Sequence, residues 1–263
     1  MKRLRDGALP LAAAKVARAS LPIYSYPTNY NDHFETSLQA YTDLLPALDA
    51  LCKKLQRTRA TLSIYDPFYC NGRVKTTLAS LGFENVYNAN EDCYAAWAAK
   101  KAPQFDVIIT NPPYSEDHKR RSLEFCLSSQ KPFFWLVPSY TIQRQYYKQA
   151  VEQGSGSGGA VFFALPRAQY TYDHPEGTGA EASPFASLWV ASGGVGCPNL
   201  INQWRHATQG AAGGSVTLCS TPAEAAQEGG LPTAKRPNPK QRKRLKKLLA
   251  ASGKKGTGPE HVK

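Results

Sequence analysis

The residues with the clearest chemical use are Asn-Pro-Pro-Tyr at 111–114, which follow an apolar run at 105–110. The run predicts a buried strand, and the prolines end it because proline lacks a backbone N–H and fixes φ. The turn is therefore stiff, and it holds an amide, backbone carbonyls and an aromatic ring at the strand's carboxyl end, where ligands bind in open α/β sheets. We expect a planar amino group to donate to Asn111 and to the Pro112 carbonyl, with its ring against Tyr114.

This tetrapeptide resembles the motif of the amino-group methyltransferases, which use S-adenosylmethionine (SAM) to methylate exocyclic nitrogens, chiefly N6 of adenine. An ordinary Pro-Pro turn that closes a buried strand is the alternative interpretation. Three further segments lie where that family has its other motifs, and together they favour the methyltransferase. The resemblance implies four catalytic residues, of which the first also contacts SAM: Asn111, Pro112, Pro113 and Tyr114.

The first of these segments, 66–72, lies between a predicted strand at 62–65 and a predicted helix at 73–81. Strand, tight turn and helix form the setting in which a glycine-containing loop binds a cofactor. Cys70 stands where the family's loop, Asp-Pro-Phe-x-Gly-x-Gly, has its first glycine, a position where the backbone approaches the ligand or adopts φ > 0. A turn without a cofactor is the alternative. The resemblance implies these SAM contacts: Asp66, Pro67, Phe68 and Gly72.

The second segment follows a predicted strand at 84–88. The resemblance implies that Asn88 and Asp92 hold the ribose and adenine of SAM, with Glu91 less favoured. A helix cap and first-turn acid explain Glu91 and Asp92 equally well. Only 38 residues separate Gly72 from Asn111, so we expect one strand–helix unit to be abbreviated.

The third segment, Tyr30 to Ser37, precedes an amphipathic helix predicted at 38–55. It resembles the family's motif that folds over the methionine part of SAM. Thr36 matches the hydroxyl of that motif, whereas Ser37 replaces a proline. A capped helix entry is the alternative for this segment.

Strands and helices alternate through the rest of the chain. After helices at 115–129 and 142–153 and a strand at 132–138, two more strands, 160–165 and 185–191, are expected to pair antiparallel. This alternation predicts an α/β fold with a mostly parallel sheet and helices on both faces, which the resemblance makes a Rossmann-like class I SAM-dependent methyltransferase fold. We expect four regions: a basic arm at 1–22, this domain at 23–205, a Gly/Ala-rich linker at 206–234 and a disordered basic tail at 235–263.

Candidate substrate contacts lie in two places. The predicted loop at 166–184 carries Arg167 and Tyr170, and in related enzymes this loop borders the substrate cleft. A basic cluster, Lys119, Arg120 and Arg121, follows the Asn-Pro-Pro-Tyr turn and is placed to guide phosphates, as are Arg144 and Lys148. A solvated loop and an exposed helix face are the alternatives.

Charge is distributed unevenly. The net charge is +12, and residues 235–255 contain ten Lys/Arg and no acid. Such a tail binds polyanions through counterion release and is typical of a nuclear or nucleolar protein. The basic arm at 1–22 makes mitochondrial import the alternative. Six cysteines without CxxC spacing and five scattered histidines indicate no metal site and an intracellular, reducing compartment. No apolar run approaches the ~18–20 residues of a membrane span.

The expected activity is SAM-dependent N6-adenine methylation of nucleic acid, with RNA favoured and ribosomal RNA the leading substrate because of the basic tail. DNA adenine methylation is close behind, since the tetrapeptide does not distinguish the two polymers. Glutamine-N5 methylation of protein is a third candidate, and a non-catalytic nucleic-acid-binding protein on the same scaffold is a fourth. A partner subunit is compatible with each of them.

Overall fold

The computed structural model describes residues 22–154, 160–177, 179–180, 183, 185–208 and 214–231. The expected basic arm, up to residue 21, and the expected basic tail at 235–263 lie outside the described residues. Within the described ranges, no helix combines the length and apolar character that a membrane crossing requires.

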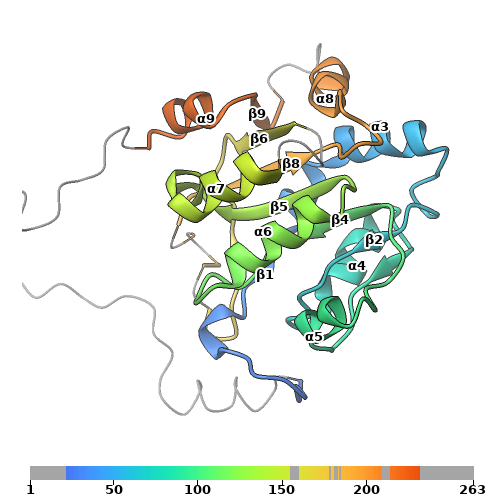
Figure 1. The fold of residues 1–263 in the computed structure, drawn as a ribbon, viewed down its shortest axis with the longest axis vertical. Helices are drawn as coiled ribbons and strands as arrows, with labels where there is room; N and C mark the ends of the chain where they lie inside the picture. Colours follow the sequence, from blue (N-terminus) through green and yellow to red (C-terminus); the bar gives the residue numbers. More distant parts are fainter. Residues whose placement is uncertain are drawn as a thin grey trace, which may run out of the picture.

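A mixed sheet of seven strands forms the centre of the molecule, in the order β3-β2-β4-β5-β8-β6-β9 (Figure 1). The first four strands in that order pair in parallel. β8 is antiparallel to β5 and β6, so β6 runs with the first four, and β9 is antiparallel to β6. The strands are β2 (Ile64–Tyr65), β3 (Val86–Tyr87), β4 (Val107–Thr110), β5 (Phe133–Pro138), β6 (Val161–Pro166), β8 (Ser187–Ser192) and β9 (Val216–Cys219).

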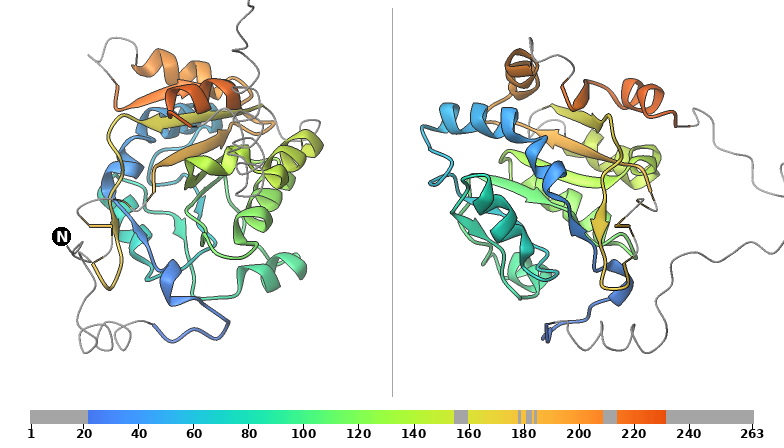
Figure 2. Two further views of the ribbon diagram at one scale, coloured as in Figure 1. Left: turned by 90° about the vertical axis from the view of Figure 1, so that its left-hand side faces the viewer. Right: turned by 180° about the vertical axis from the view of Figure 1, so that it is seen from behind.

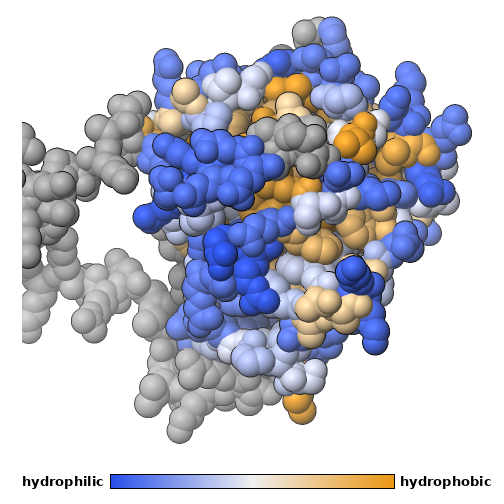
Figure 3. Space-filling model, viewed as in Figure 1, coloured by the Kyte–Doolittle hydropathy of each residue, from blue (hydrophilic) through white to orange (hydrophobic). Residues whose placement is uncertain are grey.

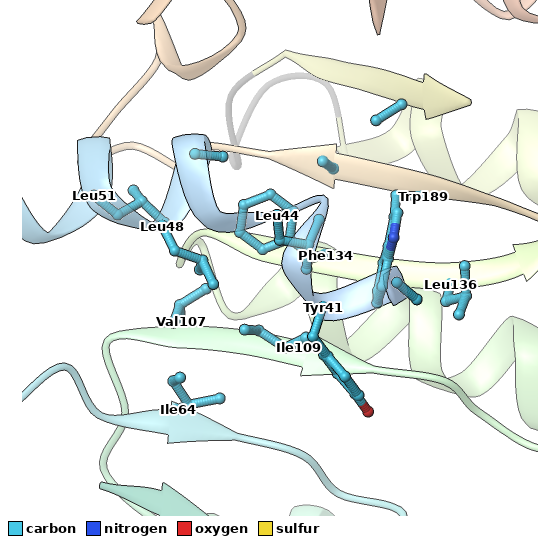
Figure 4. Close-up of a cluster of buried hydrophobic side chains, with 14 of the residues drawn as sticks. Tyr41, Leu44, Leu48, Leu51, Ile64, Val107, Ile109, Phe134, Leu136 and Trp189 are labelled. Carbon is cyan, nitrogen blue, oxygen red and sulfur yellow. The ribbon is translucent and has the colours of Figure 1, made fainter. Parts of the chain in front are cut away.

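Helices cover both faces of this sheet because successive strand side chains point to opposite faces. In β4, Val107 and Ile109 pack into one apolar cluster, while Ile108 packs into another. The first cluster is closed by Leu48 and other residues of α2 and α3 (Figure 4). Its helices are α2 (Leu38–Thr42), α3 (Leu45–Leu55), α4 (Arg73–Ser80) and α8 (Leu200–Thr208); the second cluster takes α6 (His118–Ser128), η2 (Ser139–Gln143), α7 (Gln145–Gly154) and α9 (Pro222–Glu228).

The predicted α/β, Rossmann-like fold is confirmed, including the antiparallel pairing of β6 with β8. The chain passes from β2 through α4 to β3 on one side, then returns to β4 on the other side of β2. The switch point of the sheet therefore lies between the carboxyl ends of β2 and β4, where α/β sheets bind ligands. The abbreviated unit is also confirmed: in the fully described stretch 88–106 the one regular element is the short helix α5 (Cys93–Ala98).

The predicted linker at 206–234 is wrong for its described part. Residues 216–219 form β9, which extends the main sheet, and α9 packs Ala225 into the second cluster. The Thr221 hydroxyl accepts from the Glu224 N–H, and Pro222 occupies the first helical position. These are ordinary helix-start signals, which the surrounding Gly and Ala residues obscured.

Two predicted helices are each interrupted. The segment 38–55 divides into α2 and α3 around Asp43, whose carboxylate accepts from the Tyr170 hydroxyl. The segment expected as a helix at 142–153 is instead η2 followed by α7, and α6 begins at His118 rather than Ser115.

A second, two-stranded sheet attaches the N-terminal segment to the main domain. β1 (Glu35–Thr36) pairs antiparallel with β7 (Tyr172–Asp173), and the two lie side by side in Figure 2. The preceding turn, η1 (Tyr30–Asp32), is thereby held beside the carboxyl ends of the central strands.

Candidate active site

A cavity of about 390 Å³ opens at the switch point. It is bounded by the N-terminal segment, the loop after β2, the start of α5, the Asn-Pro-Pro-Tyr turn and the start of α6. Pockets for small ligands in proteins commonly have volumes of about 300–1,000 Å³. Its wall includes Tyr24, His33, Phe68, Cys70, Asp92 and Asn111.

The Asn-Pro-Pro-Tyr turn holds a buried hydrogen-bond acceptor without a partner next to this cavity. Asn111 and Pro113 line it. The Asn111 Nδ2 donates to the Thr36 hydroxyl across 3.0 Å. Among the residues that the structure describes, nothing donates to the buried Asn111 Oδ1. A buried acceptor without a partner is costly, so this oxygen is suited to receive a ligand N–H.

Asp32 holds the same turn from the N-terminal segment, and the sequence did not single it out. Its Oδ1 accepts from the backbone N–H groups of Tyr114 and Ser115, each at 3.2 Å, while Oδ2 accepts from the Ser115 hydroxyl. The available signal was its position inside the segment 30–37. The carboxylate therefore fixes the backbone that follows Pro113.

Tyr114 is not among the residues that line the cavity, so the ring face expected for the base is not presented there. Its ring packs edge-on against Phe185, with centroids 4.9 Å apart, and its Oη is buried. Burial raises the pKa of Tyr114 well above its usual value. The buried Lys119 ammonium donates to the Tyr114 carbonyl and lies 5.6 Å from the ring centroid. Lys119 thus positions the turn in this structure.

Asp66 ends β2 behind the cavity rather than in its wall. Its Oδ1 accepts from the Thr110 hydroxyl at 2.7 Å and from the Phe68 N–H at 3.2 Å. Desolvation raises the pKa of Asp66 to about 7, with the negative charge of Glu35 adding to the effect. The carboxyl therefore ties the ends of β2 and β4 together, while Pro67 and Phe68 line the cavity.

The loop after β2 needs left-handed backbone at both expected glycine positions. Cys70 has φ 47° and Gly72 has φ 74°. A Cβ added to Gly72 would lie 2.8 Å from the Tyr69 ring. The Tyr24 hydroxyl donates to the Cys70 carbonyl at 2.5 Å, and Glu35 accepts from the Asn71 N–H at 2.8 Å. Cys70 thus adopts the conformation expected of the glycine it replaces, at the steric cost of a side chain.

The two predicted ribose and adenine contacts differ in location. Asn88 is buried behind the loop, where its Nδ2 donates to the carbonyls of Asp66 and Phe68, each at 3.1 Å. Asp92 lines the cavity and also caps α5 by accepting from the N–H groups of Tyr94 and Ala95. Asn88 therefore supports the loop, and both interpretations of Asp92 are compatible with its location.

One wall of the cavity is formed by α5 and α6; Arg121 was expected near the site as part of a basic cluster, whereas Tyr94 and His118 were not predicted. The Tyr94 hydroxyl is hydrogen-bonded to His118 Nδ1 at 2.6 Å, and the Arg121 guanidinium lies 3.4 Å from the centre of the Tyr94 ring. All three line the cavity. The spacing of His118 and Arg121 on one helix face was a signal, and the short connection before residue 111 was recognised, but the packing of α6 against α5 could not be read from it.

Three predicted substrate contacts lie away from the cavity wall. Arg120 is exposed and forms ion pairs with Asp117 and Glu124. Arg167 is exposed at the end of β6, where its N–H donates to the Ser215 carbonyl. The prediction that Tyr170 contacts substrate is wrong. Tyr170 is 2% exposed, and its hydroxyl donates to Asp43 at 2.7 Å. Its neighbours belong to the first apolar cluster, so Tyr170 is a core residue.

All six cysteines are free, and no group of three or more His, Cys, Asp or Glu side chains in the described ranges is arranged to hold a metal ion.

No family model matches the sequence, and no curated protein matches it. The solved structures with a likeness to this chain include precorrin-6y C5,15-methyltransferase from Geobacter metallireducens GS-15. Its TM-score is 0.29, with 12% identity over 63% of this chain and 98% of that one. A likeness at this level assigns neither fold nor activity.

Proposed function

We propose that this protein is a SAM-dependent N6-adenine methyltransferase that acts on nucleic acid, with RNA the favoured substrate. The observation that carries the proposal is the free, buried Oδ1 of Asn111 beside a ligand-sized cavity at the switch point of the sheet. A nucleobase amine is the partner that such an acceptor fits, and the resemblance of residues 111–114 to the amino-group methyltransferases supports the same assignment.

The cavity residues fit SAM in their chemistry. Pro67, Phe68 and the left-handed Cys70 provide a tight loop with apolar surface, and Asp92 offers a carboxylate oxygen for ribose hydroxyls. When bound, SAM supplies an electrophilic methyl group. Asn88 and Asp66 hold the loop from behind, so that its backbone keeps one conformation.

The chain's own residues act on the amine. The lone pair of a base amine is delocalised into the ring, which makes the nitrogen a poor nucleophile. When the two N–H groups of the amine donate hydrogen bonds to Asn111 Oδ1 and to the Pro112 carbonyl, they favour a pyramidal nitrogen with a localised lone pair. Catalysis then consists of orientation and electrostatics, without a strong base. Thr36 fixes the Asn111 amide by accepting from its Nδ2.

The charge distribution supports the proposed polymer and compartment. The tail at 235–255 has ten cations and no acid, which favours a polyanionic partner and a nuclear or nucleolar location. DNA is the second candidate polymer. Glutamine-N5 methylation of protein is a third candidate, because a carboxamide also donates two protons. A non-catalytic role is the fourth, and Cys70 in the cofactor loop favours it.

Transfer of labelled methyl from SAM separates these candidates. The full chain is incubated with labelled SAM and total RNA, DNA or protein, and each polymer is then digested for nucleoside or amino-acid analysis. N6-methyladenosine from RNA is the expected product. Label in N6-methyldeoxyadenosine or in methylglutamine assigns DNA or protein as the substrate instead, and SAM binding that is undetectable at millimolar concentration overturns the enzyme assignment.

A further inference from the structure

We propose that Tyr140, Arg144 and Lys148 form a platform that binds the single-stranded nucleic acid flanking the target adenine. This inference rests on the proposed function and adds the surface along which the polymer runs. Tyr140 supplies a ring for stacking with a base, and the two cations contact phosphates on either side.

The topology determines the side from which the polymer approaches. The cavity lies over β2 and the start of α5, on one side of the Asn-Pro-Pro-Tyr turn. On the other side, β5 pairs in parallel with β4, so the carboxyl ends of both strands meet at the same edge. η2 begins directly after β5, at Ser139. The first surface that a polymer meets beyond the turn is therefore η2 and the start of α7.

Tyr140 is the exposed aromatic residue on that surface. Its side chain is 40% exposed, although its neighbours Ser139, Thr141 and Ile142 are buried. The buried neighbours fix η2, so the Tyr140 ring is held outward. Because η2 follows β5 directly and β5 pairs in parallel with β4, Tyr140 lies at the same edge of the sheet as the Asn-Pro-Pro-Tyr turn.

Two basic residues follow Tyr140 along the chain. The Arg144 guanidinium lies 5.0 Å from the Tyr140 ring centre, and Lys148 follows one helical turn later. In the part of the chain that the structure describes, neither has a carboxylate within ion-pair distance, whereas Arg120 has two. Burial lowers the pKa of Lys119, the Asp32 carboxylate raises it, and the charge of Arg144 has a smaller lowering effect. A bound phosphate would relieve the repulsion between Arg144 and Lys119.

An exposed ring with flanking cations is the arrangement that single-strand binders use, because every base has a face to stack and every linkage carries a charge. The surface over α7 is hydrophilic in Figure 3, which argues against an apolar protein partner at this place. An acidic protein segment would use the cations but would gain little from the ring. The ring therefore favours nucleic acid.

The test uses the full chain and a 12-nucleotide RNA with 2-aminopurine next to a single adenine. Stacking on an aromatic ring changes 2-aminopurine fluorescence. Residues 1–21 and 232–263 contain no Phe, Trp or Tyr, so binding by the arm or the tail does not produce the stacking signal. The variants are Tyr140→Ala, Tyr140→Phe and the double variant Arg144→Ala/Lys148→Ala. The charge-matched control is Lys53→Ala/Lys75→Ala, on exposed positions of α3 and α4.

We expect Tyr140→Ala to abolish most of the fluorescence change and to weaken RNA binding about fivefold or more, while Tyr140→Phe retains both. The Arg144/Lys148 variant should reduce the slope of log K against log salt by about 1.4, or about 0.7 per lost phosphate contact, with the control much less affected.

Equal fluorescence signals from Tyr140→Ala and wild type would overturn the platform. So does displacement of the RNA by a poly-glutamate peptide from wild type and Tyr140→Ala alike. None of these readouts requires methyl transfer, so a platform without methylation refutes the proposed function alone, and methylation without the platform refutes this inference alone.

Discussion

The Asn111 amide nitrogen donates to the hydroxyl of Thr36, 75 positions earlier in the chain, across 3.0 Å. This contact uses the nitrogen of the amide and leaves the buried oxygen without a partner. The orientation of the acceptor is therefore set by tertiary structure rather than by the turn alone.

Replacing Asn111 with alanine removes the acceptor without filling the cavity. We expect SAM binding to remain and kcat to fall by about 10²–10³, the usual effect of removing one preorganised hydrogen-bonding group. Calorimetry with SAM and steady-state kinetics on adenine-containing RNA measure the two effects. Asn85→Ala, an exposed asparagine before β3, is the matched control. Wild-type turnover in Asn111→Ala contradicts the role of Asn111.

Thr36→Val tests the positioning contact. The valine keeps the shape of the side chain but cannot accept the proton of Asn111, and an unpaired buried donor costs about 1–3 kcal/mol. We expect kcat to fall roughly five- to 150-fold, with a smaller change in KM. Thr36→Ser keeps the acceptor and should recover most of the rate. If the serine and valine variants have equal kcat, the hydroxyl does not position the amide.

Cys70→Gly should strengthen the cofactor loop. A left-handed φ of 47° is strained for any residue with a Cβ, and glycine relieves this strain, worth up to about 1 kcal/mol. We expect a higher unfolding free energy and several-fold tighter SAM binding by calorimetry. Gln56→Gly, also left-handed but at the end of α3, should raise stability without changing SAM affinity. Weaker SAM binding by Cys70→Gly would show that the thiol itself contributes.

Asp66 makes stability depend on pH. Because burial raises the pKa of Asp66 from 3.8 to about 7, the folded state retains a proton that the unfolded state releases. The contribution of this carboxyl to the free energy of unfolding is fully present below about pH 4. It is lost as pH rises to 7, by up to about 1.4 kcal/mol per pH unit. Asp66→Asn keeps the acceptor for Thr110 and does not ionise. Urea unfolding from pH 5 to 8 should therefore show that the free energy of unfolding of Asp66→Asn rises relative to that of wild type as pH increases. Parallel pH profiles for the two proteins would contradict this.

The sequence was sufficient to predict those parts of the candidate site whose structure is determined by local geometry. The loop at 66–72 and the turn at 111–114 are short, and glycine or proline restricts each of them, so their motifs correctly indicated strand ends. At residue 70 the resemblance implied either a close approach of the backbone to the ligand or φ > 0, and the structure shows a φ of 47°.

The remaining site residues depend on contacts between distant segments. Tyr170 is in an aromatic, glycine-rich stretch, but whether its ring is exposed or buried depends on Asp43, 127 positions away. The wall made by Tyr94, His118 and Arg121 exists because α5 stands in place of a longer strand–helix unit. Residues 206–234 show the opposite error, since low-complexity composition concealed a strand whose pairing with β6 is long-range.

The hydrogen bonds between Asp32 and the backbone of Tyr114 and Ser115 span more than 80 positions and join the first described segment to the middle of the chain. Such contacts are lost early when a terminal segment detaches, while the central strands remain paired. In a denaturant titration, turnover should therefore disappear at lower urea than the far-UV circular dichroism signal. Coincident midpoints would show that the N-terminal segment and the sheet melt as one unit.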